Sequence, residues 1–334
     1  MGWNFKYDGC GRGVVANPSV RLARKRERYE RAVTVRAFVL RQKMDLNTPK
    51  IVAVSPVVMG IWMVLQLVDR DMTSVGRHSF RAASFDPNSS WLEDSATEYR
   101  RLLTEFSPPL KPIPLDGIDI LDVSALKSFF AGHLIPPFRG KIFDAVRSDF
   151  GEVLSYMVLE NHYATEIALK SVRDRERTDC PARGIDIVGF ETKEKLCLII
   201  GECKVSDDIT SPPKVVDKNK DCLRVQLTKH VSQKDETIRK LTQLARRASS
   251  QIGRDRLLAA ILYWQENRWD LLEIVCCPLL IRSHGVYRPT DFGSLMSDDA
   301  GFENTTIRFI ILVTPEPIDE TIRKWYDMVK LEVS

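Results

Sequence analysis

The chain has 334 residues, of which 44% are hydrophobic and 28% are charged, as is usual for a soluble globular protein. It shows no collagen-like, heptad or solenoid repeat, and it is long enough for two domains or for one large domain with an extension. The formal net charge is +4, but residues 11–43 alone hold ten basic and two acidic residues, a local charge of +8 that leaves −4 for the rest. A nucleic-acid surface on the main body must therefore be a local patch.

The cysteines predict neither a zinc site nor a disulfide framework. Their number is odd and no two form a C-x-x-C pair. We therefore expect a reducing, cytoplasmic location. The seven residues are Cys10, Cys180, Cys197, Cys203, Cys222, Cys276 and Cys277.

The N-terminal region begins with the arginine-rich stretch and continues into an uncharged run over 51–68. A membrane helix needs about 20 predominantly apolar residues, so this run is at the lower limit of length. Ser55, Pro56 and Gln66 dilute it, and we favour a buried strand or helix over a membrane span. Residues 1–70 are thus expected to be a basic leader with an apolar segment, which either does not fold alone or is not part of the native protein.

Residues 71–135 are expected to form an N-terminal accessory region. The sequence predicts irregular surface chain over 84–123 around one helix, because 107–117 contains four prolines. A helix over 123–134 follows and Pro136-Pro137 ends it. We place the start of the C-terminal domain, 136–334, at this point.

The C-terminal domain begins with an ordered α/β pattern. A helix is predicted over 150–162, with Asp149 as its cap and Glu152 in its first turn. Strands are predicted over 165–172, 184–191 and 195–206, and the short ETKEK segment joins the last two as a hairpin. Helical segments are expected after residue 218, strands over 271–283 and 305–315, and a final helix from Pro317.

Three charged residues lie at the ends of the predicted hairpin. Asp186 is in the first strand, and Glu202 and Lys204 are two residues apart in the second, so that both project from one face. Paired carboxylates suit a hard cation such as Mg²⁺, and a lysine beside them can orient an attacking water or offset developing charge. The pattern therefore indicates metal-assisted phosphodiester hydrolysis. A structural ion pair or a solvated strand end are the alternatives.

A basic amphipathic helix is predicted over 235–252. Its apolar positions mark one face, and basic residues follow the others. Binding to phosphates is one interpretation and a solvated face is the other. The candidate nucleic-acid contacts are Arg239, Lys240, Arg246 and Arg247, together with Arg183 before the Asp186 strand.

The segments FGEVLSYMVLE, RGIDIVGF and LIIGECK together resemble the core of the PD-(D/E)xK nuclease superfamily. The resemblance covers roughly residues 140–250. More narrowly, the chain resembles the nuclease subunit of the Hachiman anti-phage defence system. It departs from the superfamily name at Ile185, where proline is usual, and no Q-x-x-x-Y element follows Lys204.

This resemblance implies a restriction-endonuclease-like αβββαβ core that cuts DNA with Mg²⁺ or Mn²⁺. It assigns Asp186, Glu202 and the backbone carbonyl of Cys203 as metal ligands, with Glu152 completing the shell and Lys204 activating water. It also implies a cytoplasmic defence effector with a helicase partner, and since the chain has no P-loop the motor must be another polypeptide. A ribonuclease and a non-catalytic binding or assembly module on the same fold remain the alternatives.

Overall fold

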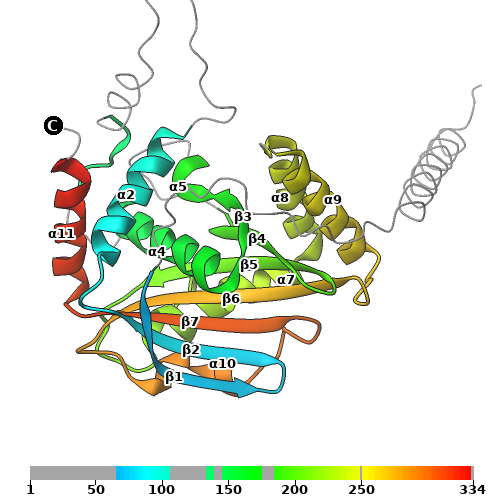
Figure 1. The fold of residues 1–334 in the computed structure, drawn as a ribbon. Helices are drawn as coiled ribbons and strands as arrows, with labels where there is room; N and C mark the ends of the chain where they lie inside the picture. The colour runs from blue at the N-terminus through cyan, green and yellow to red at the C-terminus, as the bar shows by residue number, and fades with distance from the viewer. Residues whose placement is uncertain (1–64, 106–132, 139–144, 175–183, 249, 332–334) are drawn as a thin grey trace, which may run out of the picture. The chain divides into compact units, whose positions relative to one another are not determined.

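A single mixed sheet is the centre of the fold in the computed structural model, which describes residues 65–105, 133–138, 145–174, 184–248 and 250–331. These residues all belong to one compact unit, Met63–Ser334. Its strands run in the order β1-β2-β7-β6-β5-β4-β3 (Figure 1). They are β1 (Leu67–Val75), β2 (His78–Phe85), β3 (Glu166–Lys170), β4 (Ile187–Thr192), β5 (Leu196–Val205), β6 (Leu272–Ser283) and β7 (Thr306–Thr314).

Strands β2, β7, β6 and β5 are parallel neighbours, whereas β1, β4 and β3 are antiparallel to the strands beside them. Central parallel strands are covered on both faces, which explains why the sequences of β5, β6 and β7 are nearly continuous apolar runs.

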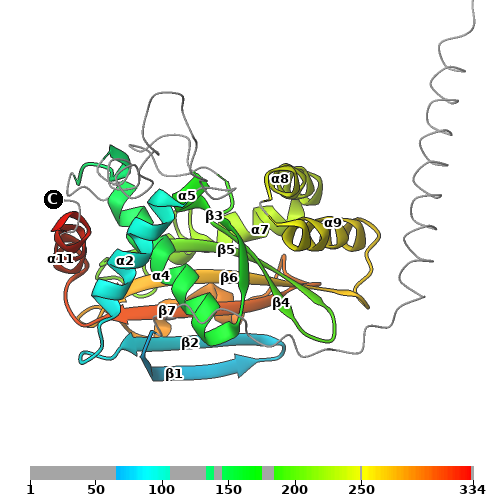
Figure 2. The same cartoon turned by 45° about the horizontal axis from the view of Figure 1, so that its top comes forward.

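Helices cover both faces of the sheet (Figures 1 and 2). One face packs against α2 (Trp91–Thr104), α4 (Ala145–Tyr163) and α11 (Ile318–Leu331). The other packs against α6 (Lys214–Asp217), α7 (Leu223–Ser232), α8 (Lys234–Arg247), α9 (Gln251–Gln265) and α10 (Ser294–Ser297). The short α5 (Ser171–Asp174) follows β3, and a 3₁₀ turn, η1 (Pro289–Phe292), precedes α10.

The α/β prediction and the αβββαβ order are confirmed by α4, β3, β4, β5, the α6–α9 helices and β6. The first helix begins earlier than expected, at Ala145. Asp149 is therefore no cap but a buried residue inside the helix, where Tyr99 donates a hydrogen bond of 2.7 Å to its Oδ2. Glu152 likewise lies in the body of α4 and not in its first turn.

The helix predicted over 235–252 is in fact two helices. Helix α8 ends at Arg247, and the Ser250 side chain starts α9 by accepting a 2.9 Å hydrogen bond from the Gly253 amide. Ile252, expected on the apolar face of one helix, belongs to α9 and is 64% exposed. The apolar spacing continues through this region, but capping by Ser250 starts a new helix within it.

Part of the predicted accessory region contributes directly to the central sheet. Strand β2 pairs with β7 over six residue pairs, and α2 packs on the same face as α4 and α11. The proline-rich segment 107–117 and most of the helix predicted over 123–134 lie outside the described residues. So do residues 51–64 of the apolar run, and no helix within the described ranges is long and apolar enough to cross a membrane.

Candidate active site

The β4–β5 hairpin brings the two predicted strand carboxylates together. Its antiparallel register ends with Ile187 paired to Gly201. Asp186, the residue before β4, forms a side-chain hydrogen bond with Glu202, the residue after Gly201. Asp186 Oδ2 also accepts a 3.0 Å hydrogen bond from the backbone amide of Cys203, which fixes its carboxylate against the end of β5.

Helix α4 brings the third carboxylate, Glu152, to the same place. The residue before it, Gly151, lies so close to β5 that a Cβ atom there would meet Val205 Cγ2 at 2.6 Å and Cys203 Sγ at 3.0 Å. Only a glycine permits this approach without a shift of the neighbours. Glu152 itself is 3% exposed, so its carboxylate lies inside the protein.

Hydroxyl groups surround the Glu152 carboxylate. Ser148 Oγ donates to Oε1 at 3.0 Å, and Tyr156 OH donates to Oε2 at 3.0 Å. Ser171 Oγ, at the start of α5, forms a further short hydrogen bond to Oε2. The same tyrosine hydroxyl accepts from the Ser171 amide at 2.9 Å, so that α4 and α5 are joined through the group that holds Glu152.

Glu202 is held from the other face of the sheet. It is 1% exposed, and its Oε1 lies 2.7 Å from Nε2 of His230, a buried residue of α7. Thr237 Oγ1 of α8 in turn donates a 2.7 Å hydrogen bond to the His230 carbonyl. These contacts tie the carboxylate of β5 to the junction between α7 and α8.

Burial and mutual repulsion raise the pKa values of the three carboxyl groups. Burial, with the charges of Asp186 and Asp149, raises the pKa of Glu152 to about 8. Burial raises the pKa of Glu202 to about 7, although Lys204 and a hydrogen bond with Asp186 act in the opposite direction. Burial and the Glu202 charge hold the pKa of Asp186 well above its usual range, even though the residue keeps some surface exposure. Three buried carboxyls that repel one another are costly unless a cation or protons balance them.

Two lysines are close enough to act on this cluster. Lys204, half-buried on β5, lowers the pKa of both Asp186 and Glu202 by its charge. Lys240 of α8 also lowers the pKa of Glu202, and with burial it brings the pKa of His230 down to about 4. Lys240 is additionally paired with Glu236 at 3.2 Å. One residue of the predicted basic stripe therefore lies within electrostatic range of the carboxylates.

Three of the other predicted nucleic-acid contacts lie on the surface of α8. Arg239, Arg246 and Arg247 are exposed on α8, as a phosphate-binding face requires. Arg183 lies outside the described residues. The structure thus brings Glu152, Asp186, Glu202 and Lys204 within electrostatic range of one another and leaves the three arginines of α8 exposed.

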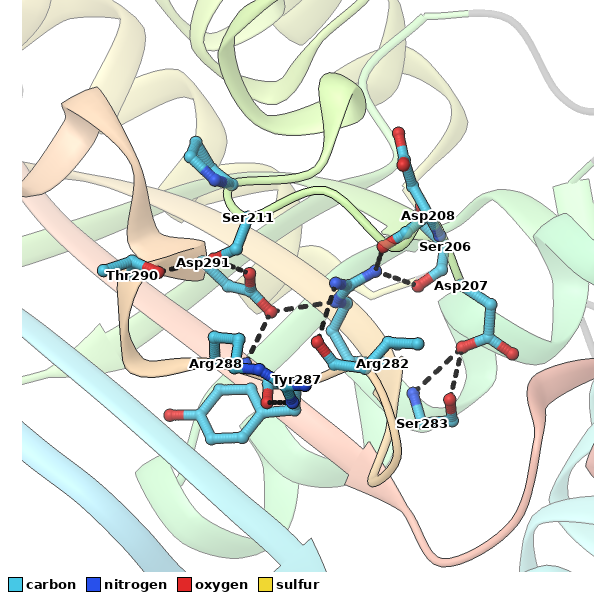
Figure 3. Close-up of polar contacts among 12 residues, drawn as sticks. Ser206, Asp207, Asp208, Ser211, Arg282, Ser283, Tyr287, Arg288, Thr290 and Asp291 are labelled. Atoms are coloured by element: carbon cyan, nitrogen blue, oxygen red, sulfur yellow. Dashed lines mark hydrogen bonds and ion pairs between the residues drawn. The ribbon is translucent and has the colours of Figure 1, made fainter.

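The segment after Lys204 is fixed by a buried guanidinium (Figure 3). Arg282, at the end of β6, is fully buried and donates from Nη1 to the carbonyls of Ser206 and Asp208, both at 2.8 Å. Its Nε donates to Asp291 Oδ2 at 2.9 Å, an ion pair in which neither side chain is exposed. Asp207 accepts from the Ser283 hydroxyl at 2.6 Å and from the Ile318 amide at 2.8 Å. The end of the Glu202–Lys204 strand is therefore firmly held.

The donor set suits a hard divalent cation, but the side chains are not arranged as a closed shell. Three carboxylates and the Cys203 carbonyl offer only oxygen, which is the preference of Mg²⁺ and Mn²⁺. Among the described residues, however, no three His, Cys, Asp or Glu side chains are placed so that they could hold an ion as they stand. Glu202 is turned to His230 and Glu152 to its hydroxyls. The residues fit by chemistry: Glu202 keeps Oε2 for an ion while its Oε1 contacts His230, and Glu152 would have to turn from its hydroxyl partners to complete the shell.

Sequence reasoning missed His230, Tyr156 and Ser171. His230 and Ser171 are distant from their partners in the chain, and no local period marks them. Tyr156 is four residues after Glu152, on the same helical face, and this spacing was the one available signal.

Comparison with known proteins gives one family match. A family model named HamA matches residues 78–259, which is more than half of the chain and includes β2, the hairpin and most of α9. No curated protein and no solved structure matches the chain.

Proposed function

The chain belongs to the HamA family of the Hachiman anti-phage defence system, and we propose that within this system it is a metal-dependent DNA nuclease of the PD-(D/E)xK type. The observation that carries the proposal is the cluster of Glu152, Asp186 and Glu202 beside Lys204. Burying three carboxylates together has a large energetic cost, and such perturbed groups concentrate at functional sites.

Each residue has a role that its position supports. Asp186 and Glu202, opposed across the hairpin, would hold Mg²⁺ or Mn²⁺ together with the Cys203 carbonyl, and Glu152 would complete the shell. Bound there, the ion would supply positive charge to the scissile phosphate and acidify a water molecule. Lys204, on the same strand face as Glu202, would orient that water and offset the charge that develops on the phosphate.

DNA and a helicase are the proposed substrate and partner. The exposed arginines of α8 lie on the helix that also carries Lys240 to the site, so a phosphate backbone on α8 would pass near the carboxylates. The Hachiman system includes a helicase, and this chain has no P-loop of its own. A motor that delivers or exposes DNA would therefore be a separate subunit, acting with this protein in the cytoplasm.

The test is cleavage of plasmid and linear DNA by the full chain, alone and together with the helicase of its system, in Mg²⁺, Mn²⁺ or EDTA. We expect metal-dependent cleavage that falls by at least roughly 100-fold in Glu202→Gln and in Lys204→Met, the scale of losing a proton-transfer or charge-stabilising group. Glu194→Gln and Lys220→Met are matched controls, because both side chains are exposed and away from the cluster.

A second candidate is a non-catalytic nucleic-acid-binding or assembly module. The observation in its favour is that Glu152 and Glu202 already have hydrogen-bond partners within the protein. Absence of cleavage even with the helicase, together with unchanged phage protection in Glu202→Gln and Lys204→Met cells, would select this alternative. RNA substrates in the same assay separate a ribonuclease from a deoxyribonuclease.

A further inference from the structure

Glu202 is oriented by a residue that the carboxylate–lysine motif does not contain. Within the described part of the chain, the hydrogen-bond partners of its carboxyl group are His230 and Asp186. Nε2 of His230 lies 2.7 Å from Oε1 of Glu202, so His230 does not contact the other carboxylate oxygen, Oε2. A strand carboxylate with two rotatable torsions beyond Cβ would otherwise be free to turn away from Asp186.

A buried histidine requires a polar partner, and His230 has one in Glu202. Its side chain is 8% exposed on a helix whose other buried side chains, Leu223 and Leu227, are apolar. Nε2 of the ring lies 2.7 Å from Glu202 Oε1, and an imidazole with its proton on Nε2 donates a hydrogen bond to that oxygen. The neighbouring backbone is fixed too, because Thr237 Oγ1 binds the His230 carbonyl.

From this geometry we propose that His230 is a positioning residue of the cation site, which holds Oε1 of Glu202 so that Oε2 is presented beside Asp186. The inference rests on the proposed function. It gives the junction of α7 and α8 a role in the site. The helices between β5 and β6 would orient the metal-binding carboxylate of Glu202 and also carry the basic face of α8. Hydrogen-bond partners of metal-binding carboxylates typically contribute 10–100-fold to metal affinity.

The variants His230→Gln and His230→Asn separate positioning from packing. The glutamine amide reaches about as far as Nε2 of the ring, whereas the asparagine amide is one methylene shorter and falls short of Glu202. We expect Mn²⁺ binding, measured by titration calorimetry on the full chain, to weaken by roughly 10–100-fold in His230→Asn and by less than about 3-fold in His230→Gln. His284→Asn, at an exposed loop position, is the control and should bind like the wild type.

The outcomes separate failure of the His230 proposal from failure of the proposed nuclease function. If Glu202→Gln leaves Mn²⁺ binding unchanged, the cation site itself is wrong. If Glu202→Gln abolishes binding while His230→Asn binds like the wild type, or if the asparagine and glutamine variants weaken binding equally, the positioning role is refuted. Circular dichroism and the unfolding midpoint of each variant exclude misfolding, and His230→Gln supplies the readout if His230→Asn does not fold: loss of binding in a folded His230→Gln protein contradicts the proposal.

Discussion

Substitution of Gly151 by alanine tests whether the close approach of α4 to β5 builds the site. The new Cβ atom would lie 2.6 Å from Val205 Cγ2, against 3.4 Å or more in an ordinary contact. Alanine in a helix interior gains about 1 kcal/mol over glycine, but overpacking a tight interior costs about 1–3 kcal/mol. The Val205 side chain is stiff about χ1 and cannot turn its methyl group away, so the overpacking cost exceeds the gain in helix propensity. We expect Gly151→Ala to reduce the free energy of unfolding by up to about 2 kcal/mol.

The same substitution should reduce cleavage, because α4 carries Glu152 and must move away from β5 to relieve the contact. A displacement of about 1 Å at a catalytic group costs roughly 100-fold in rate. Removing the opposing methyl groups with Val205→Ala costs on the order of 1–2 kcal/mol by itself, but it should recover both stability and cleavage in the Gly151→Ala background.

Urea denaturation of the four proteins in this double-mutant cycle measures the compensation, and we expect a coupling of at least about 1 kcal/mol. Gly285→Ala is the matched control, since a Cβ atom there meets no atom within 4 Å. Additive effects in the cycle, or a Gly151→Ala protein as stable and active as the wild type, would refute the packing argument.

Three further predictions concern charge. In EDTA, the free energy of unfolding should fall as pH rises from about 5 to 8, because Glu152 and Glu202 have folded pKa values raised to about 8 and 7: the stability that each contributes is complete below its unfolded pKa of 4.5 and is lost as pH passes its folded pKa, by up to about 1.4 kcal/mol per pH unit for each group. Glu152→Gln should flatten the profile of thermal midpoint against pH, and an unaltered slope would contradict this. Replacing Arg246 and Arg247 by alanine should reduce the slope of log affinity for duplex DNA against log salt by about 1–2, whereas Lys218→Ala with Lys220→Ala, exposed residues before α7, should leave it unchanged. Arg282→Met should destabilise the protein by about 3–5 kcal/mol in urea, because it leaves Asp291 charged, buried and unpaired, and adding Asp291→Asn should recover part of this loss.

Local pattern was sufficient for the hairpin that carries the site. A short turn between two apolar strands determines the pairing, and the register then brings Asp186, just before β4, to Glu202 near the end of β5. The buried strands β6 and β7 and the helix α11 were equally readable, since Ile322, Trp325 and Val329 recur at helical spacing and are all buried. These elements were predictable because neighbouring residues decide them.

Features that depend on distant contacts were not predictable in this way. The pairing of β2 with β7 joins residues more than 220 positions apart, and nothing in either strand specifies its partner. The break between α8 and α9 depends on whether Ser250 caps a helix or lies within one, and the apolar period fits both. His230 meets Glu202 only because α7 folds back onto β5.

The carboxylate cluster is hard to explain as a device for stability alone. Glu191 and Arg308 show how this fold treats a buried charge when stability is the purpose: two side chains of opposite sign form a paired contact, and the pKa of Glu191 is lowered. At Glu152, Asp186 and Glu202 the signs are alike and the pKa values are raised. A fold that gathers like charges at one place, while it pairs opposite charges elsewhere, has the pattern expected of the cation site proposed above. Glu152→Gln should accordingly stabilise the metal-free protein near pH 8 while it impairs cleavage, a trade of stability for function that a merely structural cluster would not show.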